Sequence, residues 1–164
     1  MDHPGNSPLT ASRQYAYISI DSTQQKIRLL NVKPGGYDEE TISISHSHVR
    51  LSDKPTYVAL SYVWCDKKAA RTCSLDDVRL AINDSLYRAL RRFRGESKCL
   101  TLWVDALCIN QNDLDERSVQ VQLMRKTYEG ADSISAWLGI PQNNDNVEAA
   151  VRIVNPLTQR VSAD

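Results

Sequence analysis

The sequence lacks the features that mark several large classes of protein. No apolar run approaches the roughly 18–20 residues that a membrane-spanning helix needs, and the first residues have no signal-peptide pattern. Its 20 basic and 20 acidic side chains cancel, so no overall field attracts nucleic acid or an anionic membrane. We therefore expect a cytoplasmic protein without a membrane span and without a nucleic-acid partner.

Motifs for metal, phosphate and nucleophilic chemistry are missing as well. The four cysteines have no C-x-x-C spacing, which favours free thiols over a zinc site. His46 and His48 share one face of a predicted strand, but no third ligand is suggested, so we expect no metal. No glycine-rich phosphate loop and no obvious Ser–His or Cys–His pair occurs. No cofactor is indicated.

The composition, with 41% apolar and 24% charged side chains in 164 residues, is typical of one globular domain. Apolar runs predict strands at 15–20, 27–32, 41–45, 57–64, 78–82, 100–109 and 133–138. Helices are predicted at 84–94 and 147–154. A third helix is predicted after the N-cap Asp113, with a core stripe of Leu114, Val121, Met124, Tyr128 and Ala131. The alternation predicts an α/β fold with a central, mainly parallel sheet flanked by helices.

Several motifs, in this order, resemble the fungal HET (heterokaryon incompatibility) domain. They are an opening motif at 27–30 with Pro34-Gly35, the run 57–64, the run 102–111, Glu116-Arg117, and 137–139. The resemblance covers 27–140 and implies a HET domain over 15–154, between a disordered tail at 1–14 and a C-terminal tail at 155–164. Whether the chain is truncated from a longer protein stays open. Cys65 stands where the family usually has glycine; a positive φ there would cost about 1 kcal/mol.

The resemblance also implies a function. HET domains act in fungal non-self recognition, where they trigger programmed cell death after incompatible cells fuse. The family is distantly similar to TIR domains, some of which cleave NAD, which implies a TIR- or flavodoxin-like core with additional N-terminal strands. NAD would then be a substrate, and self-association or an incompatibility partner protein would be expected.

Glu116 is the first candidate for a catalytic carboxylate. It follows a predicted central strand and lies in the first turn of a helix, where a TIR-like catalytic glutamate is expected. NAD cleavage needs a carboxylate that stabilises an oxocarbenium-like ribosyl centre. The alternative is a capping box with Asp113, whose loss would cost about 1 kcal/mol.

Asp105 is the second candidate, because a carboxylate inside an apolar run needs a partner. Arg117 or a backbone amide would supply one, and ion pairing is the alternative to catalysis. The substrate-binding candidates are Ser61, Tyr62, Trp64, Asn110, Gln111 and Arg117. The amide side chains suit ribose hydroxyls or turn formation, and Trp64 suits nicotinamide stacking or the core.

Two classes of function stay open. One is an enzyme that hydrolyses NAD, and the other is a signalling module, or a diverged inactive copy, that acts by assembly without turnover. They differ in whether Glu116, Asp105, Ser61 and Trp64 converge on one open pocket. A Glu116 that is fully occupied by structural contacts would weaken the enzyme hypothesis.

Overall fold

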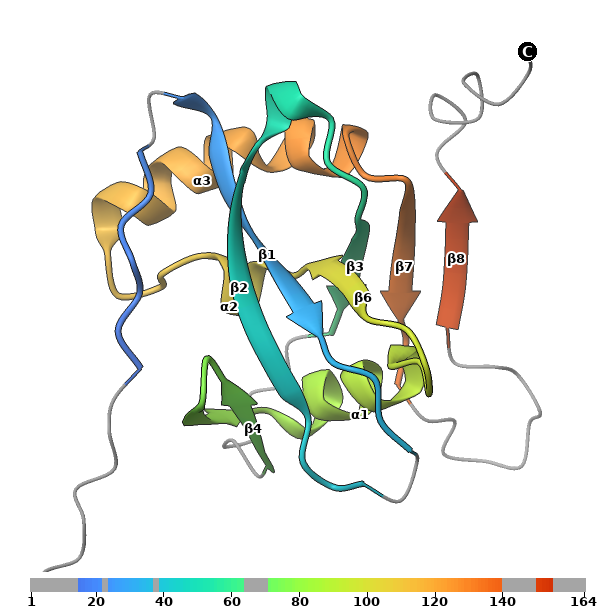
Figure 1. Cartoon of the computed structure of the whole chain (residues 1–164). Helices are drawn as coiled ribbons and strands as arrows, with labels where there is room; N and C mark the ends of the chain where they lie inside the picture. Colours follow the sequence, from blue (N-terminus) through green and yellow to red (C-terminus); the bar gives the residue numbers. More distant parts are fainter. Residues whose placement is uncertain (1–14, 22–23, 37–38, 64–70, 140–149, 155–164) are drawn as a thin grey trace, which may run out of the picture.

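The computed structural model of this chain describes residues 15–21, 24–36, 39–63 and 71–139, and the backbone of 150–154. Its centre is a sheet of eight strands in the order β5-β4-β2-β1-β6-β3-β7-β8 (Figure 1). The strands are β1 (Lys26–Val32), β2 (Ser43–Arg50), β3 (Val58–Tyr62), β4 (Arg71–Leu75), β5 (Val78–Ile82), β6 (Leu100–Trp103), β7 (Ser133–Trp137) and β8 (Ala150–Val154). The helices are α1 (Asp84–Phe93), α2 (Asp105–Cys108) and α3 (Leu114–Glu129), with a short 3-10 helix at Leu51–Asp53.

The sheet has a parallel core with antiparallel strands on both sides. Strand β3 pairs in parallel with β6 and with β7, whereas β1 and β8 join this trio antiparallel. The predicted α/β fold with a central parallel sheet is confirmed, although the sheet as a whole is mixed. The likeness of this core to TIR or flavodoxin domains stays a prediction.

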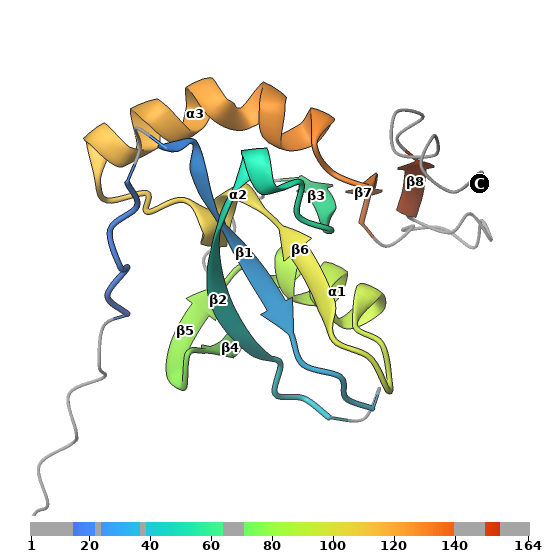
Figure 2. The same cartoon turned by 45° about the horizontal axis from the view of Figure 1, so that its top comes forward.

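Helices α1 and α3 cover opposite faces of the parallel core (Figures 1 and 2). Neighbouring residues of a strand point to opposite faces. Tyr62 accepts a hydrogen bond from Asn83 at the start of α1, whereas the Ser61 side chain acts on the Tyr128 hydroxyl of α3. The connection from β3 to β6 contains α1, and the connection from β6 to β7 contains α3 and runs the opposite way along the sheet. Because such crossovers are right-handed, their helices lie on opposite faces. The core between these layers is apolar, with Trp103, Leu30 and Leu90 among its fully buried side chains.

The predicted strand over 100–109 is wrong in its second half. Strand β6 ends at Trp103, and the amides of Leu107 and Cys108 both donate to the Val104 carbonyl, which forms the helical turn α2. A continuous apolar run does not by itself distinguish a strand from a buried helical turn. The predicted helix at 147–154 is also wrong where it is described, because 150–154 form β8; residues 147–149 lie outside the described residues.

Helix α3 begins after Asp113 as predicted, and Met124 and Tyr128 of its predicted stripe pack against the core, but its most buried face is a different one. The buried side chains are Glu116, Gln120, Leu123 and Thr127, whereas Leu114 is 66% exposed and Val121 is 53% exposed. The predicted core stripe of α3 is therefore wrong at Leu114 and Val121. The physical reason lies in the polar contacts that Glu116 and Gln120 make with β1.

A cavity of about 260 Å³ lies beside β4 and β5. Its lining consists of Thr41, Thr72, Cys73, Ser74, Asp77 and Arg79. None of the candidate site residues lines it. Within the part of the chain that the structure describes, no helix has the length and apolar character needed to cross a membrane.

Candidate functional site

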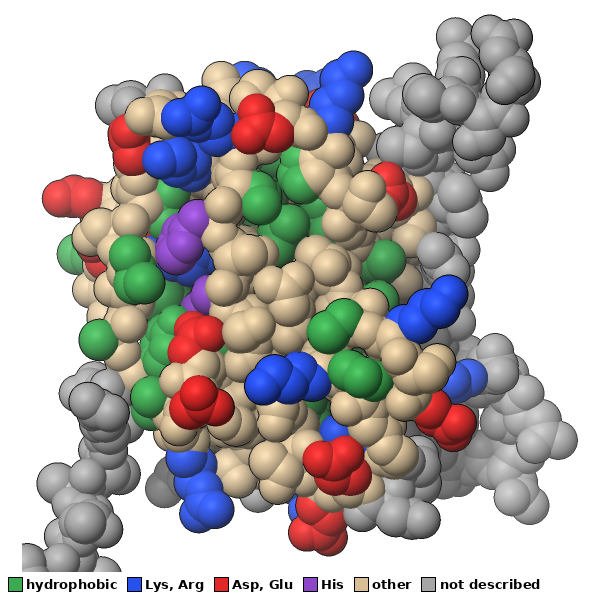
Figure 3. Space-filling model, in the orientation of Figure 1, with side chains coloured by type: hydrophobic (Ala, Val, Ile, Leu, Met, Phe, Trp, Pro, Cys, Tyr) green, Lys and Arg blue, Asp and Glu red, His purple; other side chains and the backbone are tan. Residues whose placement is uncertain are grey.

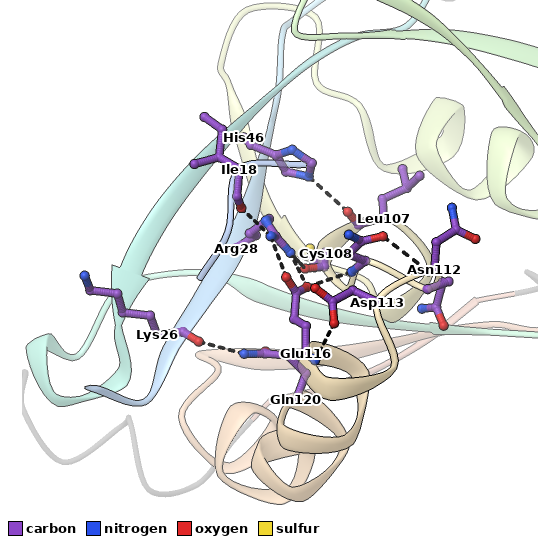
Figure 4. Close-up of polar contacts among 12 residues, drawn as sticks. Ile18, Lys26, Arg28, His46, Leu107, Cys108, Asn112, Asp113, Glu116 and Gln120 are labelled. Carbon is purple, nitrogen blue, oxygen red and sulfur yellow. Dashed lines mark hydrogen bonds and ion pairs between the residues drawn. The ribbon is translucent and has the colours of Figure 1, made fainter. Parts of the chain in front are cut away.

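A buried ion pair between Arg28 and Glu116 links β1 to the first turn of α3 (Figure 4). The Arg28 side chain is fully buried, and 6% of the Glu116 side chain is exposed. The two side chains meet through two parallel hydrogen bonds, Nη1 to Oε1 at 2.5 Å and Nη2 to Oε2 at 2.9 Å. This two-point geometry is the strongest form of an arginine–carboxylate contact.

The remaining contacts of Glu116 fix it in place. Its Oε1 also accepts the backbone N–H of Asn110 at 2.8 Å, and its own N–H donates to the Asp113 side chain at 3.0 Å. Asp113 is therefore the N-cap of α3, as predicted, but the Glu116 side chain turns toward Arg28. The carboxylate accepts three hydrogen bonds, so its charge is matched and its lone pairs are largely occupied.

Arg28 is held from several sides as well. Its Nη1 donates to the Cys108 carbonyl at 3.2 Å and its Nη2 to the Ile18 carbonyl at 2.5 Å. The Tyr17 ring lies 4.8 Å from the guanidinium carbon, a cation–π contact. Figure 4 shows Arg28 between Glu116 and the carbonyl of Ile18. The N-terminal segment thus closes the pair off from solvent.

A second polar cluster, around His46 of β2, holds the same N-terminal segment at Tyr15. The Tyr15 hydroxyl lies 2.5 Å from His46 Nδ1 and donates to Asp76 at 2.8 Å, while His46 Nε2 lies 3.0 Å from the Leu107 carbonyl. Burial lowers the pKa of His46, although the Leu107 carbonyl and Asp76 act to raise it. In the orientation of Figure 1, histidine side chains are visible on this face beside apolar ones (Figure 3).

Asp105 lies apart from Arg28, just beyond the carboxyl end of β6. It is half-buried; its Oδ1 accepts the backbone N–H of Ala106 at 2.7 Å, and its carbonyl accepts the Gln111 side chain at 3.0 Å. Burial raises the pKa of Tyr62 to about 12, and the Asp105 charge adds to that rise. The same charge acts on Tyr128. Asp105 is therefore a half-buried carboxylate whose charge acts on two phenols, at the edge where α/β sheets usually bind ligands.

Among the hydrogen bonds of the described residues, Asn110 is the candidate binding residue that contacts the Glu116 carboxylate, and it does so through its backbone N–H. Ser61 and Tyr62 point to opposite faces of β3, toward Tyr128 and Asn83 respectively. Trp64 and Cys65 lie outside the described residues. Convergence of Glu116, Asp105, Ser61 and Trp64 on one pocket thus stays untested at Trp64.

The amide side chains and Arg117 have local positions. The Asn110 side chain accepts the Asn112 N–H at 3.2 Å, and Gln111 holds the Asp105 carbonyl, so both stabilise the turn between α2 and α3. The Arg117 side chain is exposed. Of the two partners expected for Asp105, Arg117 or a backbone amide, the structure shows the second, the backbone N–H of Ala106. Arg28 is the basic partner of Glu116.

Sequence reasoning missed Arg28, although the signal was present. Arg28 interrupts an apolar strand, and a charged group in such a place needs a partner of opposite charge. Glu116, Gln120, Leu123 and Thr127 also share one face of α3, a stripe that is mostly polar. A charged residue in a strand and a polar stripe on a helix together predict an ion pair between them.

Comparison with known proteins gives two matches. The family described as heterokaryon incompatibility protein (HET) matches residues 57–163. Heterokaryon incompatibility protein 6, OR allele, of Neurospora crassa is 31% identical over 145 residues, which cover 80% of this chain and 21% of that protein. The chain thus spans about a fifth of the length of this curated relative. No solved structure matches the chain significantly.

Proposed function

Because the chain belongs to the heterokaryon incompatibility (HET) family, we propose that it serves in fungal non-self recognition. In this role it would be a cytoplasmic signalling domain that triggers programmed cell death after incompatible cells fuse. The support is the family match over 57–163 together with the relative's name. The partner would be an incompatibility protein or a second copy of the same domain.

The domain acts, in this proposal, through assembly with partners and not through turnover at Glu116. One observation carries this choice: both oxygens of the Glu116 carboxylate are bound to Arg28, and Oε1 also holds the Asn110 amide. A carboxylate that stabilises a ribosyl cation must face the substrate. To do so here, Glu116 would have to leave a fully buried guanidinium without a counter-charge, which costs several kcal/mol.

NAD hydrolysis through Asp105 is the second candidate function. Asp105 is half-buried at the carboxyl end of β6, and its charge lies near Tyr62 and Tyr128. A carboxylate there would stabilise the ribosyl cation, while a phenol would donate a hydrogen bond to a ribose hydroxyl. Burial holds the pKa of Tyr62 near 12, so its hydroxyl keeps its proton at neutral pH.

Two measurements on the same variants distinguish these functions. Expression of the chain in a fungal host is scored for cell death, and concentrated purified protein is assayed for nicotinamide release from NAD, with and without a crowding agent. Assembly predicts cell death without nicotinamide release, and Asp105→Asn should kill as well as wild type. Release that disappears in Asp105→Asn, with unchanged thermal stability, would establish the enzyme. A chain that leaves the host viable would contradict the incompatibility role.

A further inference from the structure

The N-terminal segment 15–20, which we call the strap, is attached to the sheet by a small set of contacts. Among the described residues, no backbone–backbone hydrogen bond joins the strap to a strand. Its anchors are the Tyr15 hydroxyl on His46 and Asp76, the Tyr17 ring over Arg28, and the Ile18 carbonyl on Arg28. A strap held in this way is able to leave without breaking the sheet's hydrogen-bond ladder.

The surface beneath the strap is chemically matched to it. The guanidinium of Arg28 faces an electron-rich phenol ring and a carbonyl oxygen of the strap. We call this surface, formed by Arg28, His46, His48 and Asp76, the seat. Every copy of the chain carries both a strap and a seat, so two copies that exchange straps would keep all of these contacts.

The connection between the strap and β1 contains a strained residue. The Gln24 amide donates to the Asp21 carbonyl at 3.3 Å, and Gln25 then has a φ of 49°, in the left-handed region. Glutamine is disfavoured in this region because its Cβ approaches the following carbonyl oxygen. A short connection under strain favours exchange of the element it carries, since an extended connection relieves the strain.

We propose that this chain self-associates by exchange of its straps, each copy's residues 15–20 occupying the seat of a second copy. The turn at Gln25 opens into an extended connection, and the contacts at the two seats are the same as in the closed monomer. Each Arg28–Glu116 pair is then covered by the partner copy's Tyr17, so the buried cluster is completed in trans. Exchange requires no incompatibility role, so it stands or falls separately from the proposed function.

The test changes the backbone preference of Gln25 in the full chain and measures association by sedimentation equilibrium over a range of concentrations. Glycine tolerates positive φ, so Gln25→Gly relaxes the closed turn and should raise the dimer dissociation constant roughly 25-fold, about fivefold for each of two turns. Proline is fixed near a φ of −65°, so Gln25→Pro prevents the closed turn and should lower the dissociation constant by at least as much.

Lys54 provides a matched control. It has the same φ of 49° in a turn that does not carry the strap, so Lys54→Gly should leave the dissociation constant unchanged. Lys126→Ala controls for the weak contact of 3.4 Å between Lys126 and the Gln25 side chain. In the Gln25→Pro background, Tyr15→Ala with Tyr17→Ala removes the anchors and should abolish the dimer, while circular dichroism checks that the fold persists.

Chymotrypsin cleavage after Tyr15 or Tyr17, normalised to a free peptide of residues 13–23, reports whether the strap is seated. In the Gln25→Pro dimer both straps are seated, so cleavage should be as slow as in wild type. A Gln25→Pro chain that stays monomeric and is cut rapidly would show release without exchange and would overturn the proposal. A dimer that survives loss of the two tyrosines, or dissociation constants that do not respond to Gln25, would overturn it equally.

Discussion

Replacing Glu116 by glutamine should destabilise the domain far more than the loss of a helix cap would. The substitution keeps the size of the side chain but removes the charge that compensates Arg28, whose side chain is fully buried. Breaking a buried pair by removing one partner typically costs about 3–5 kcal/mol. A capping or dipole role alone would cost about 1 kcal/mol.

The assay is urea unfolding of the purified chain followed by circular dichroism, with the free energy extrapolated linearly. For a chain of this size, 3–5 kcal/mol corresponds to a fall in Tm of roughly 6–20 °C. Asp115→Asn is the matched control, because Asp115 lies in the same turn of α3 and is exposed. Its effect should stay within about 0.5 kcal/mol.

A double variant separates the charge from the packing. Arg28→Met with Glu116→Met removes both charges and should recover most of the loss, since apolar replacement of a buried ion pair is often neutral. A loss of 1 kcal/mol or less in Glu116→Gln, or a double variant as unstable as the single one, would refute the assigned role of the pair.

Three further predictions concern single contacts. Burial lowers the folded-state pKa of His46 below its ordinary value, so the free energy of unfolding should decrease as pH falls through about 6.5. His46→Gln should flatten this dependence in urea unfolding midpoints measured between pH 5 and 8. An unchanged pH slope in the variant would contradict the prediction. Asn83→Ala removes the cap on the Leu86 amide and should cost about 1 kcal/mol in thermal unfolding, against no change for Asn112→Ala. Tyr57→Phe removes the hydrogen bond that the Tyr57 hydroxyl donates to the Thr127 carbonyl and should lower the free energy of unfolding by about 1–2 kcal/mol. A smaller effect in urea unfolding would show that water replaces the hydroxyl.

The parts of the fold that follow from local pattern were predictable. Strands β1, β3, β5 and β7 coincide closely with apolar runs bounded by turn residues, and Asn83 and Asp113 cap α1 and α3 as their side chains suggest. The order of strands and helices was enough to predict the parallel core. These features depend on neighbours in sequence, which a single chain displays directly.

The errors arise where distant residues decide the outcome. The run 100–109 is mostly apolar, and its second half forms the turn α2 packed against β1, a contact between residues far apart in sequence. Ala150–Val154 is rich in β-branched residues, but its place as β8 depends on the free edge of β7. For the site, Glu116 was recognised as a carboxylate after a strand, but Asp105 was placed inside the predicted strand 100–109, whereas β6 ends at Trp103. The partner Arg28 lies 88 residues from Glu116 in sequence.

The rotation of α3 shows why polar contacts can override hydrophobic pattern in this domain. Burying Leu114 and Val121 would gain on the order of 2 kcal/mol for each side chain. The same rotation would carry Glu116 and Gln120 away from Arg28 and from the Lys26 carbonyl, which Gln120 binds at 2.9 Å. It would leave a buried guanidinium and a partly buried carbonyl unpaired, at about 3–5 and about 1 kcal/mol respectively. The polar contacts together outweigh the apolar gain, so Arg28 fixes which face of α3 meets the sheet. The position of Glu116 is then a consequence of the fold's own electrostatics, and catalysis is not needed to explain a glutamate there.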